Sequence, residues 1–194
     1  YNISEVLELA QGATVLNVSG GQEWMGMVAH EVGKPLGSLV GYDYVRDSQG
    51  RIITTNGFFK RDPIQITYGS IVPKHVGGWI NTLTYKNFRL MAQIDFKAGH
   101  KLVSQSAYNF TRHGHHKNTL FGREGGVIMD AVNADGTPNT TAVPVESFYG
   151  SYSSQRVYTP FVYDASYIKF RTLTASADLS KYVPVSFIKG LTLN

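Results

Sequence analysis

Four histidines near the middle of the chain are the residues best suited to binding a metal. His113, His115 and His116 fall within four positions, and His100 precedes them. Neutral imidazole is a common ligand, but a closed site needs three or four ligands in fixed geometry with supporting hydrogen bonds. Here the histidines are interspersed with arginine, glycine and lysine, which favours a solvated loop. The sequence therefore predicts no metal site, and it offers no motif for a cofactor.

A run of oxygen-bearing side chains is the next candidate. Asp130, Asn133 and Asp135 stand before Gly136, as in an oxygen-rich calcium loop. The ligand spacing of one residue in two and the glutamate at the twelfth position are missing. We therefore expect a turn here and not a calcium site.

Paired carboxylates would be needed for glycoside hydrolysis. Asp95 with Glu124, or Asp130 with Glu146, could supply the acid and the base. Nothing in the sequence sets the separation of either pair or raises the pKa of one member. The chain also has no Gly-x-Ser-x-Gly motif and no cysteine nucleophile. We expect no catalytic residue and no enzymatic activity.

Aromatic side chains in the loops are the remaining candidates for ligand contact. They are Trp24, Phe58, Phe59, Tyr108, Phe110, Phe121, Phe148, Tyr149 and Tyr152. Such rings can stack on sugars, pack against a partner protein, or pack a loop against itself. As candidate ligand-binding residues we select Tyr108, Phe110, Phe148, Tyr149 and Tyr152.

Composition and charge narrow the function class further. The 194 residues carry a formal charge of +4, but the basic residues are scattered and form no stripe suited to nucleic acid. The absence of cysteine rules out disulfides. Twenty glycines, twelve tyrosines and ten phenylalanines against 16% charged residues favour strands and turns. No apolar run approaches the length of a membrane helix.

The elements that must position these residues are organised around a hairpin from Trp79 to Lys97. Its second half alternates without a break, with apolar residues at every even position from Phe88 to Phe96 and polar or sulfur-containing ones between them. Such alternation predicts a strand with one apolar face. Lys86 and Asn87 form the two-residue turn, with Asn87 suited to a positive φ.

Further strands follow the same pattern less regularly. The stretch from Tyr167 to Leu179 changes phase, which predicts a β-bulge near Arg171 or Thr172. A last strand is expected from Val185 to Leu193, after a short turn at 180–184. The segment from Asp62 to Gly78 is predicted to be irregular. Asn56-Gly57 is expected to form a turn, Val103 to Phe110 a short helix, and Ser147 to Ser153 either a helix or a ring-rich loop.

Short and long connections alternate along the chain, as they do between the strands of an outer-membrane barrel. In such a barrel, apolar residues face lipid and polar residues face a wet lumen, with aromatic residues such as Phe88 and Phe96 at the two interfaces. A soluble β-sandwich that binds carbohydrate, with the row from Phe88 to Phe96 in its core, is the alternative.

Several segments resemble the C-terminal barrel portion of SusC/RagA-type TonB-dependent outer-membrane transporters. They are Val32 to Gly37 with Gly41-Tyr42, Pro73 to Trp79 with Tyr85 to Phe88, Asp95 with Gly99, Asp130 to Asn139, and Tyr163 to Arg171. The order and spacing of these segments cover nearly all of the chain. The start at Tyr1 without an initiator Met, and the end inside an alternating pattern, also predict a fragment of a longer polypeptide.

The resemblance implies an all-β fold: antiparallel strands of a transmembrane β-barrel of about 22 strands, with long extracellular loops that contain short helices. Residues 1–78 would be an outer loop region, 79–97 a barrel hairpin, 98–164 a long outer loop and 165–194 barrel strands. The protein would lie in the outer membrane, in contact with its lipid. It would import glycans or peptides together with a SusD-like surface lipoprotein, energised by TonB through parts absent from this chain.

Overall fold

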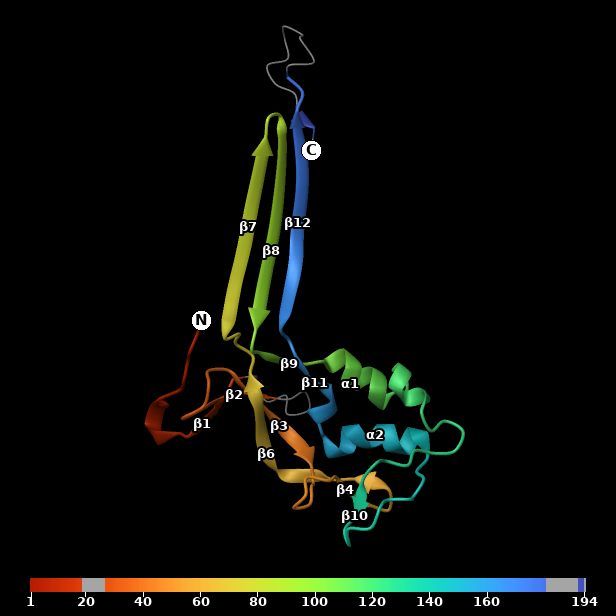
Figure 1. Cartoon of the computed structure of the whole chain (residues 1–194). Helices are drawn as coiled ribbons and strands as arrows, with labels where there is room; N and C mark the ends of the chain where they lie inside the picture. Colours follow the sequence, from red (N-terminus) through yellow and green to blue (C-terminus); the bar gives the residue numbers. More distant parts are fainter. Residues whose placement is uncertain (19–26, 181–191, 194) are drawn as a thin grey trace. The chain divides into compact units, whose positions relative to one another are not determined.

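The computed structural model describes residues 1–18, 27–180 and 192–193, and its elements are shown in Figure 1. The chain divides into two compact units. The long-strand unit comprises Tyr1–Asn2, Pro73–Gly99 and Ala165–Asn194. The helix-bearing unit comprises Ile3–Val72 and His100–Asp164. Most regular structure in the described residues is antiparallel β-strand, with few helices, which agrees with the β-rich class expected from the sequence.

The long-strand unit is a sheet with the strand order β13-β12-β8-β7. Its strands are β7 (His75–Tyr85), β8 (Phe88–Ala98), β12 (Tyr167–Asp178) and β13 (Thr192–Leu193), and all neighbours are antiparallel. The predicted hairpin with its turn at Lys86 and Asn87 is confirmed. The positive φ of 53° falls on Lys86, however, and not on Asn87 as expected. Most of the last predicted strand lies outside the described residues.

The predicted bulge is also confirmed. Phe170 pairs with Ile94 and Thr172 with Gln93, so Arg171 is an extra residue that faces no partner of its own in β8. A single extra residue changes the face to which all later side chains project. This explains why the apolar positions of β12 change from even to odd numbers.

The prediction of an irregular segment from Asp62 to Gly78 is wrong. β6 (Arg61–Ser70) runs through Pro63, and β7 begins at His75. Proline lacks a backbone donor but is tolerated on an edge strand, and β6 is the edge of its sheet. Gly77 and Gly78 both pair with β8. The start of β7 was not predicted because glycine has no side chain that could contribute to an alternating pattern.

The main sheet of the helix-bearing unit has the order β1-β2-β3-β6 and is antiparallel. It combines β6 with β1 (Val15–Asn17), β2 (Met27–Glu31) and β3 (Ser38–Tyr44). Met27, Ala29 and Val40 form a small buried cluster within it. The face that buries these residues is set by β2 and β3, whose apolar positions are mostly buried.

Two small sheets complete the strands of this unit. β4 (Ile53–Thr55) pairs with β5 (Phe58–Phe59) and, in parallel, with β10 (Val132–Asn133). β9 (Lys101–Val103) pairs with β11 (Val162–Asp164). The turn predicted at Asn56-Gly57 joins β4 to β5, and both residues have positive φ values, of 52° and 79°. This is the type I′ geometry that matches the twist of a two-residue hairpin.

The helices are α1 (Gln105–Arg112) and α2 (Val145–Gln155), with 3-10 turns at Ala10–Gly12, Lys117–Leu120 and Thr159–Phe161. The short helix predicted from Val103 to Phe110 is confirmed with a shift of two residues, because Ser104 caps it by accepting a hydrogen bond from the Ala107 N–H. The segment from Ser147 to Ser153, left open between helix and loop, is helical. Within residues 1–18, 27–180 and 192–193, no helix is long and apolar enough to cross a membrane.

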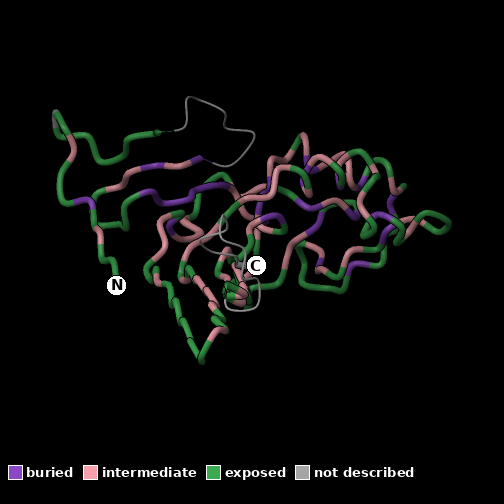
Figure 2. The backbone as a smooth tube through the Cα atoms, turned by 90° about the horizontal axis from the view of Figure 1, so that it is seen from above, coloured by how far each residue is buried: buried purple, intermediate pink, exposed green. Residues whose placement is uncertain are grey.

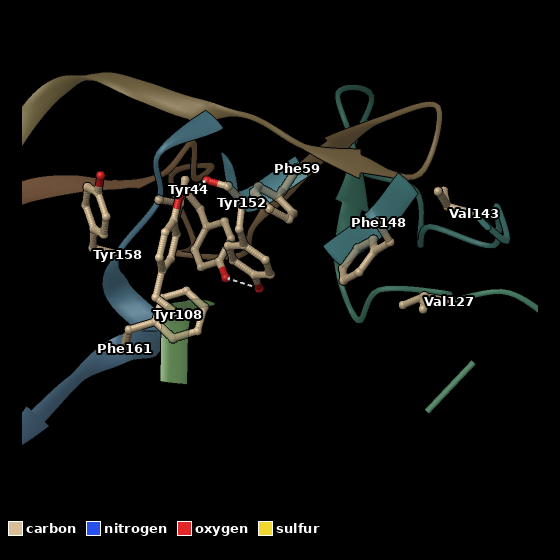
Figure 3. Close-up of a cluster of buried hydrophobic side chains, with 10 residues drawn as sticks. Tyr44, Phe59, Tyr108, Val127, Val143, Phe148, Tyr152, Tyr158 and Phe161 are labelled. Carbon is tan, nitrogen blue, oxygen red and sulfur yellow. Dashed lines mark hydrogen bonds between the residues drawn. The ribbon is translucent and has the colours of Figure 1, made fainter. Parts of the chain in front are cut away.

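The core of the helix-bearing unit is rich in aromatic rings (Figure 3). Phe59 is fully buried and makes edge-on or tilted contacts with Tyr44, Phe148 and Tyr152. The hydroxyls of Tyr44 and Tyr152 are hydrogen-bonded to each other at 2.8 Å. Rings from strands and helices far apart in the sequence thus fasten β3 and β5 to α2.

Candidate functional site

The side chains of the long-strand unit sort onto two faces according to the strand pairing. Trp79 of β7, Ile94 of β8 and Phe170 of β12 stand side by side in one row across three strands. Side chains two positions away project to the same face. The apolar face defined in this way also contains Leu83, Tyr85, Phe88, Leu90, Ala92, Phe96, Ile168, Leu173, Ala175 and Ala177, together with Gly77 and Asn81.

The large side chains of the apolar face are exposed. Trp79 is 54% exposed, Phe88 65% and Ile168 80%. In Figure 2 the three long strands carry the colours of exposed and intermediate residues, and no residue of β7, β8 or β12 is buried. The sandwich alternative requires the row from Phe88 to Phe96 to be a core, so this exposure contradicts it.

The opposite, polar face is charged and hydroxyl-rich. Among the described residues it carries four basic side chains, Arg89, Lys97, Lys169 and Arg171, against two acidic side chains, Asp95 and Asp178. Arg171 donates from Nε and Nη2 to the two carboxylate oxygens of Asp95, and the Tyr167 hydroxyl donates to the same carboxylate at 3.3 Å. Threonines and serines of β7 and β12 occupy much of the rest, with Val76, Ile80 and Met91 as apolar exceptions.

The strands have the length of membrane-crossing strands. β7 and β8 contain 11 residues each and β12 contains 12, and a tilted strand of about 9–11 residues crosses the hydrocarbon core of a bilayer. β7 forms one edge of the sheet, with no described strand beyond it. An open edge of this length exposes backbone groups that require a further strand in a bilayer.

The five aromatic residues selected from the sequence fall into two groups. Tyr108, Phe148 and Tyr152 are buried in the core of the helix-bearing unit. Phe110 is 53% exposed, and Tyr149 is partly exposed with its hydroxyl bonded to the Asn118 carbonyl. The geometry favours self-packing for the first three and leaves Phe110 and Tyr149 accessible to a ligand. Of the other loop aromatics, Phe58 and Phe59 form β5, and Trp24 lies outside the described residues.

His116 and Asp135, two of the polar candidates from the sequence, make local contacts within their own turns. His116 caps a 3-10 turn by accepting from the Asn118 N–H. Asp135 accepts from the backbone and side chain of Thr137, which stabilises the turn expected there and holds the pKa of Asp135 below its usual value. In the part of the chain that the structure describes, no three histidine or acidic side chains are arranged to hold a metal ion.

A partly buried polar network joins β3 to the turn before β11. Asp43 accepts a 2.5 Å hydrogen bond from the Thr159 hydroxyl and a 3.1 Å one from Arg46 Nε. Burial raises the pKa of Asp43, but these donors outweigh it and bring the pKa below its usual value of 3.8. The Tyr68 hydroxyl lies 3.0 Å from that of Thr159 and donates to the Tyr42 carbonyl. Burial raises the pKa of Tyr68 to about 12.

A cavity of about 460 Å³ lies between the helices of this unit and was not expected from the sequence. Arg112 at the end of α1 and Arg123 after the 3-10 turn line it, facing Glu146 and Tyr149 of α2. These residues come together only through the packing of α1 against α2, so spacing along the chain could not reveal them. The available signal in the sequence was the helical pattern of the two segments that form α1 and α2.

No protein-family model matches the chain, and no curated protein matches it. Solved structures do match. A chain of the RagAB peptide importer in the closed-closed state aligns with 98% of this chain and 22% of its own length, with 17% identity and a TM-score of 0.57. A chain of the open-open state of that importer aligns with 98% of this chain and 22% of its own length, with 17% identity and a TM-score of 0.56. A chain of the RagAB peptide transporter aligns with 97% of this chain and 20% of its own length, with 15% identity and a TM-score of 0.56. The likeness establishes a shared fold, and this chain spans about a fifth of the length of those chains.

Proposed function

We propose that this chain forms part of the membrane-spanning wall, and the attached extracellular loops, of a SusC/RagA-type outer-membrane importer driven by TonB. The observation that carries the proposal is the exposed apolar face, which continues in register across three strands of membrane-crossing length. The shared fold with chains of the RagAB peptide importer supports the same role. In this role β7 pairs with a further strand of the closed barrel.

Energetics favour lipid as the environment of the apolar face. Nine of its large side chains are between 40% and 80% exposed. Fully burying one such side chain contributes roughly 1.5–3 kcal/mol, so leaving the face in water would cost on the order of 10 kcal/mol. Contact with hydrocarbon removes this cost, while the polar face meets a water-filled lumen.

The proposed mechanism is gated import without covalent chemistry. Substrate is captured outside with a SusD-like lipoprotein and passes along the polar face when TonB moves a plug domain from the inner side. The substrate is a peptide or a glycan, and the peptide class is favoured because the structural neighbours are described as peptide importers. In this mechanism the chain supplies wall and loops.

Site-directed spin labelling tests the proposal directly. The 194 residues contain no cysteine, so Leu90→Cys and Met91→Cys each introduce the single labelling site of this part of the protein, on opposite faces of β8. In the intact protein in lipid, the label at 90 should be relaxed by oxygen, which concentrates in hydrocarbon, and the label at 91 by a water-soluble nickel complex. Labels from 88 to 97 should repeat this alternation with a period of two.

Ser154→Cys, on the exposed surface of α2, is the matched control and should respond to the nickel complex. A label at position 90 that responds to the nickel complex as strongly as the control, or to neither reagent, would place the apolar face outside lipid. Either result would overturn the proposed role.

A further inference from the structure

The cavity of the helix-bearing unit brings two guanidinium groups to one space. Arg112 is the last residue of α1, and Arg123 follows the 3-10 turn at Lys117–Leu120. Both line the cavity of about 460 Å³, which lies entirely within this unit. A cavity of this volume has the size of a small-molecule site.

Both guanidinium groups are held in place without being neutralised. Arg112 donates to Asn109 Oδ1 at 3.0 Å and to Ser153 Oγ at 2.9 Å. Arg123 donates to the carbonyls of Thr119 and Gly114 at 3.1 and 2.7 Å. A guanidinium has five N–H donors, and neither arginine forms an ion pair among the described residues. Each therefore keeps donors and its full positive charge for a ligand.

α2 forms the opposite wall of the cavity, and its side chains determine the chemistry of the rest of the ligand. Val145 and the Tyr149 ring supply apolar surface, and the hydrogen bond from the Tyr149 hydroxyl to the Asn118 carbonyl fixes the ring. Glu146 adds one negative charge and forms no ion pair with either arginine. A dianion such as phosphate is therefore less favoured than a single carboxylate on an apolar body.

We propose that this cavity is a binding site for small organic carboxylates, with Arg112 and Arg123 holding the carboxylate and Tyr149 packing against the apolar remainder. A planar guanidinium matches a carboxylate in geometry and can donate two parallel hydrogen bonds to it. The site does not depend on the proposed transport role, because all its residues lie in one unit.

Titration calorimetry on the intact protein in detergent tests the site. The probes are hippurate, which joins a carboxylate to an aromatic ring, its neutral amide hippuramide, and inorganic phosphate. Hippurate should bind. Hippuramide should bind at least about tenfold more weakly, because it lacks the charge that strengthens the hydrogen bonds from the two guanidinium groups. Phosphate should bind more weakly than hippurate.

Three variants locate the site. Arg123→Gln should weaken hippurate binding about tenfold or more for the same reason. Glu146→Gln should strengthen it by a few-fold, because it removes a like charge from an exposed position without breaking a hydrogen bond. Lys117→Gln removes a neighbouring charge that does not line the cavity, and it should change the affinity less than about twofold.

Near-ultraviolet circular dichroism would reveal whether Arg123→Gln disturbs its loop. Even then, the expected gain in hippurate affinity of Glu146→Gln keeps the test decisive. Equal binding of hippurate and hippuramide, tighter binding of phosphate, no detectable binding of hippurate, or unchanged affinity in Glu146→Gln would each overturn the assignment.

Discussion

Arg171 binds Asp95 with two hydrogen bonds, of 2.5 and 2.8 Å, although Arg171 is the residue that has no pairing partner in β8. The bulge thus provides an additional side chain on the polar face. Because Phe170 and Thr172 pair with the consecutive residues Ile94 and Gln93, the ladder on either side is complete without Arg171.

Deleting Arg171 should therefore preserve the pairing of β12 with β8. The apolar positions 168, 170, 173, 175 and 177 would then alternate without interruption. A spin label at position 173 should keep its contact with oxygen in lipid, because its face does not change. Asp95 would lose its two hydrogen bonds from Arg171, so any loss of stability should come from the polar face.

Deletion of Thr174 is the matched control, because Thr174 pairs with Met91. It should move labels at 175 and 177 to the polar face, where the nickel complex reaches them. If the two deletions had equal effects on these labels, the bulge would not be the cause of the phase change.

Gly57 should be the least replaceable residue of the turn between β4 and β5. Its φ is +79°, and a Cβ added there would lie 2.6 Å from Val143 Cγ2 in the core. Gly57→Ala should lower the free energy of unfolding by about 2–5 kcal/mol, since backbone strain costs about 1–2 kcal/mol and overpacking about 1–3 kcal/mol. Denaturant unfolding of the chain in detergent measures this change.

The same substitution made in a Val143→Ala background separates the two causes. There the contact with Val143 is absent while the Thr141 carbonyl oxygen, 3.0 Å from the added Cβ, remains, so Gly57→Ala should cost less than in the wild-type chain and at least the backbone strain of about 1–2 kcal/mol. An equal cost in both backgrounds would show that Val143 does not limit this position.

The hydroxyl pair of Tyr44 and Tyr152 should be strongly coupled. Both residues are buried, with side chains 6% and 7% exposed. Tyr152→Phe leaves the Tyr44 hydroxyl buried without its partner, which should cost about 1–3 kcal/mol. Tyr44→Phe/Tyr152→Phe should cost less than the sum of the single changes, and denaturant unfolding of all four proteins gives the coupling. Additive single effects would argue against the hydrogen bond.

Alkaline pH should destabilise the helix-bearing unit. Burial raises the pKa of Tyr44 and of Tyr152 above the usual 10.0, and that of Tyr68 to about 12. The unfolded chain loses these phenol protons first, so the free energy of unfolding falls as the pH rises above 10, by up to about 1.4 kcal/mol per unit and tyrosine. For Tyr68 the fall ends near pH 12.

Urea unfolding between pH 9 and pH 11.5 measures this slope. The Tyr44→Phe/Tyr152→Phe variant should have a shallower slope than the wild-type chain, because two of the titrating groups are gone. Identical slopes would assign the alkaline effect to other residues.

The sequence was sufficient for the elements whose signal is local. The alternation of β8, the bulge at Arg171 and the turn at Asn56-Gly57 each depend on neighbouring residues, and each was predicted correctly. β6 was missed because Pro63 is a strand breaker except at an edge, and edge position is a property of the whole sheet. The start of β7 was missed because Gly77 and Gly78 have no side chains to alternate.

The candidate site was less accessible to sequence reasoning. Tyr108, Phe148 and Tyr152 were selected as candidates for ligand contact, but they are buried in one core cluster with Phe59 and Tyr44, which lie some fifty to a hundred residues earlier in the chain. Their burial is set by these distant contacts. The cavity with Arg112 and Arg123 has the same origin, because it exists only where α1 and α2 pack together.

Acid should destabilise the helix-bearing unit through Asp43. Burial opposes ionisation of this carboxylate, yet the donors Arg46 and Thr159 keep its pKa below 3.8. As the pH falls below about 4, the unfolded chain takes up the proton first, so the free energy of unfolding decreases until the folded carboxylate is also protonated. Thr159→Val removes one donor and should cost about 1–2 kcal/mol at pH 7, while making the decrease in acid smaller. Unfolding curves at pH 3 and pH 7 for wild type, Thr159→Val and Asp43→Asn provide the comparison, with Asp43→Asn as the variant that cannot titrate.

Asp43→Asn could lose as much stability between pH 7 and pH 3 as the wild-type chain does. In that case Asp43 contributes nothing to acid sensitivity, and the other carboxylates with lowered pKa values, Asp47 and Asp135, account for it.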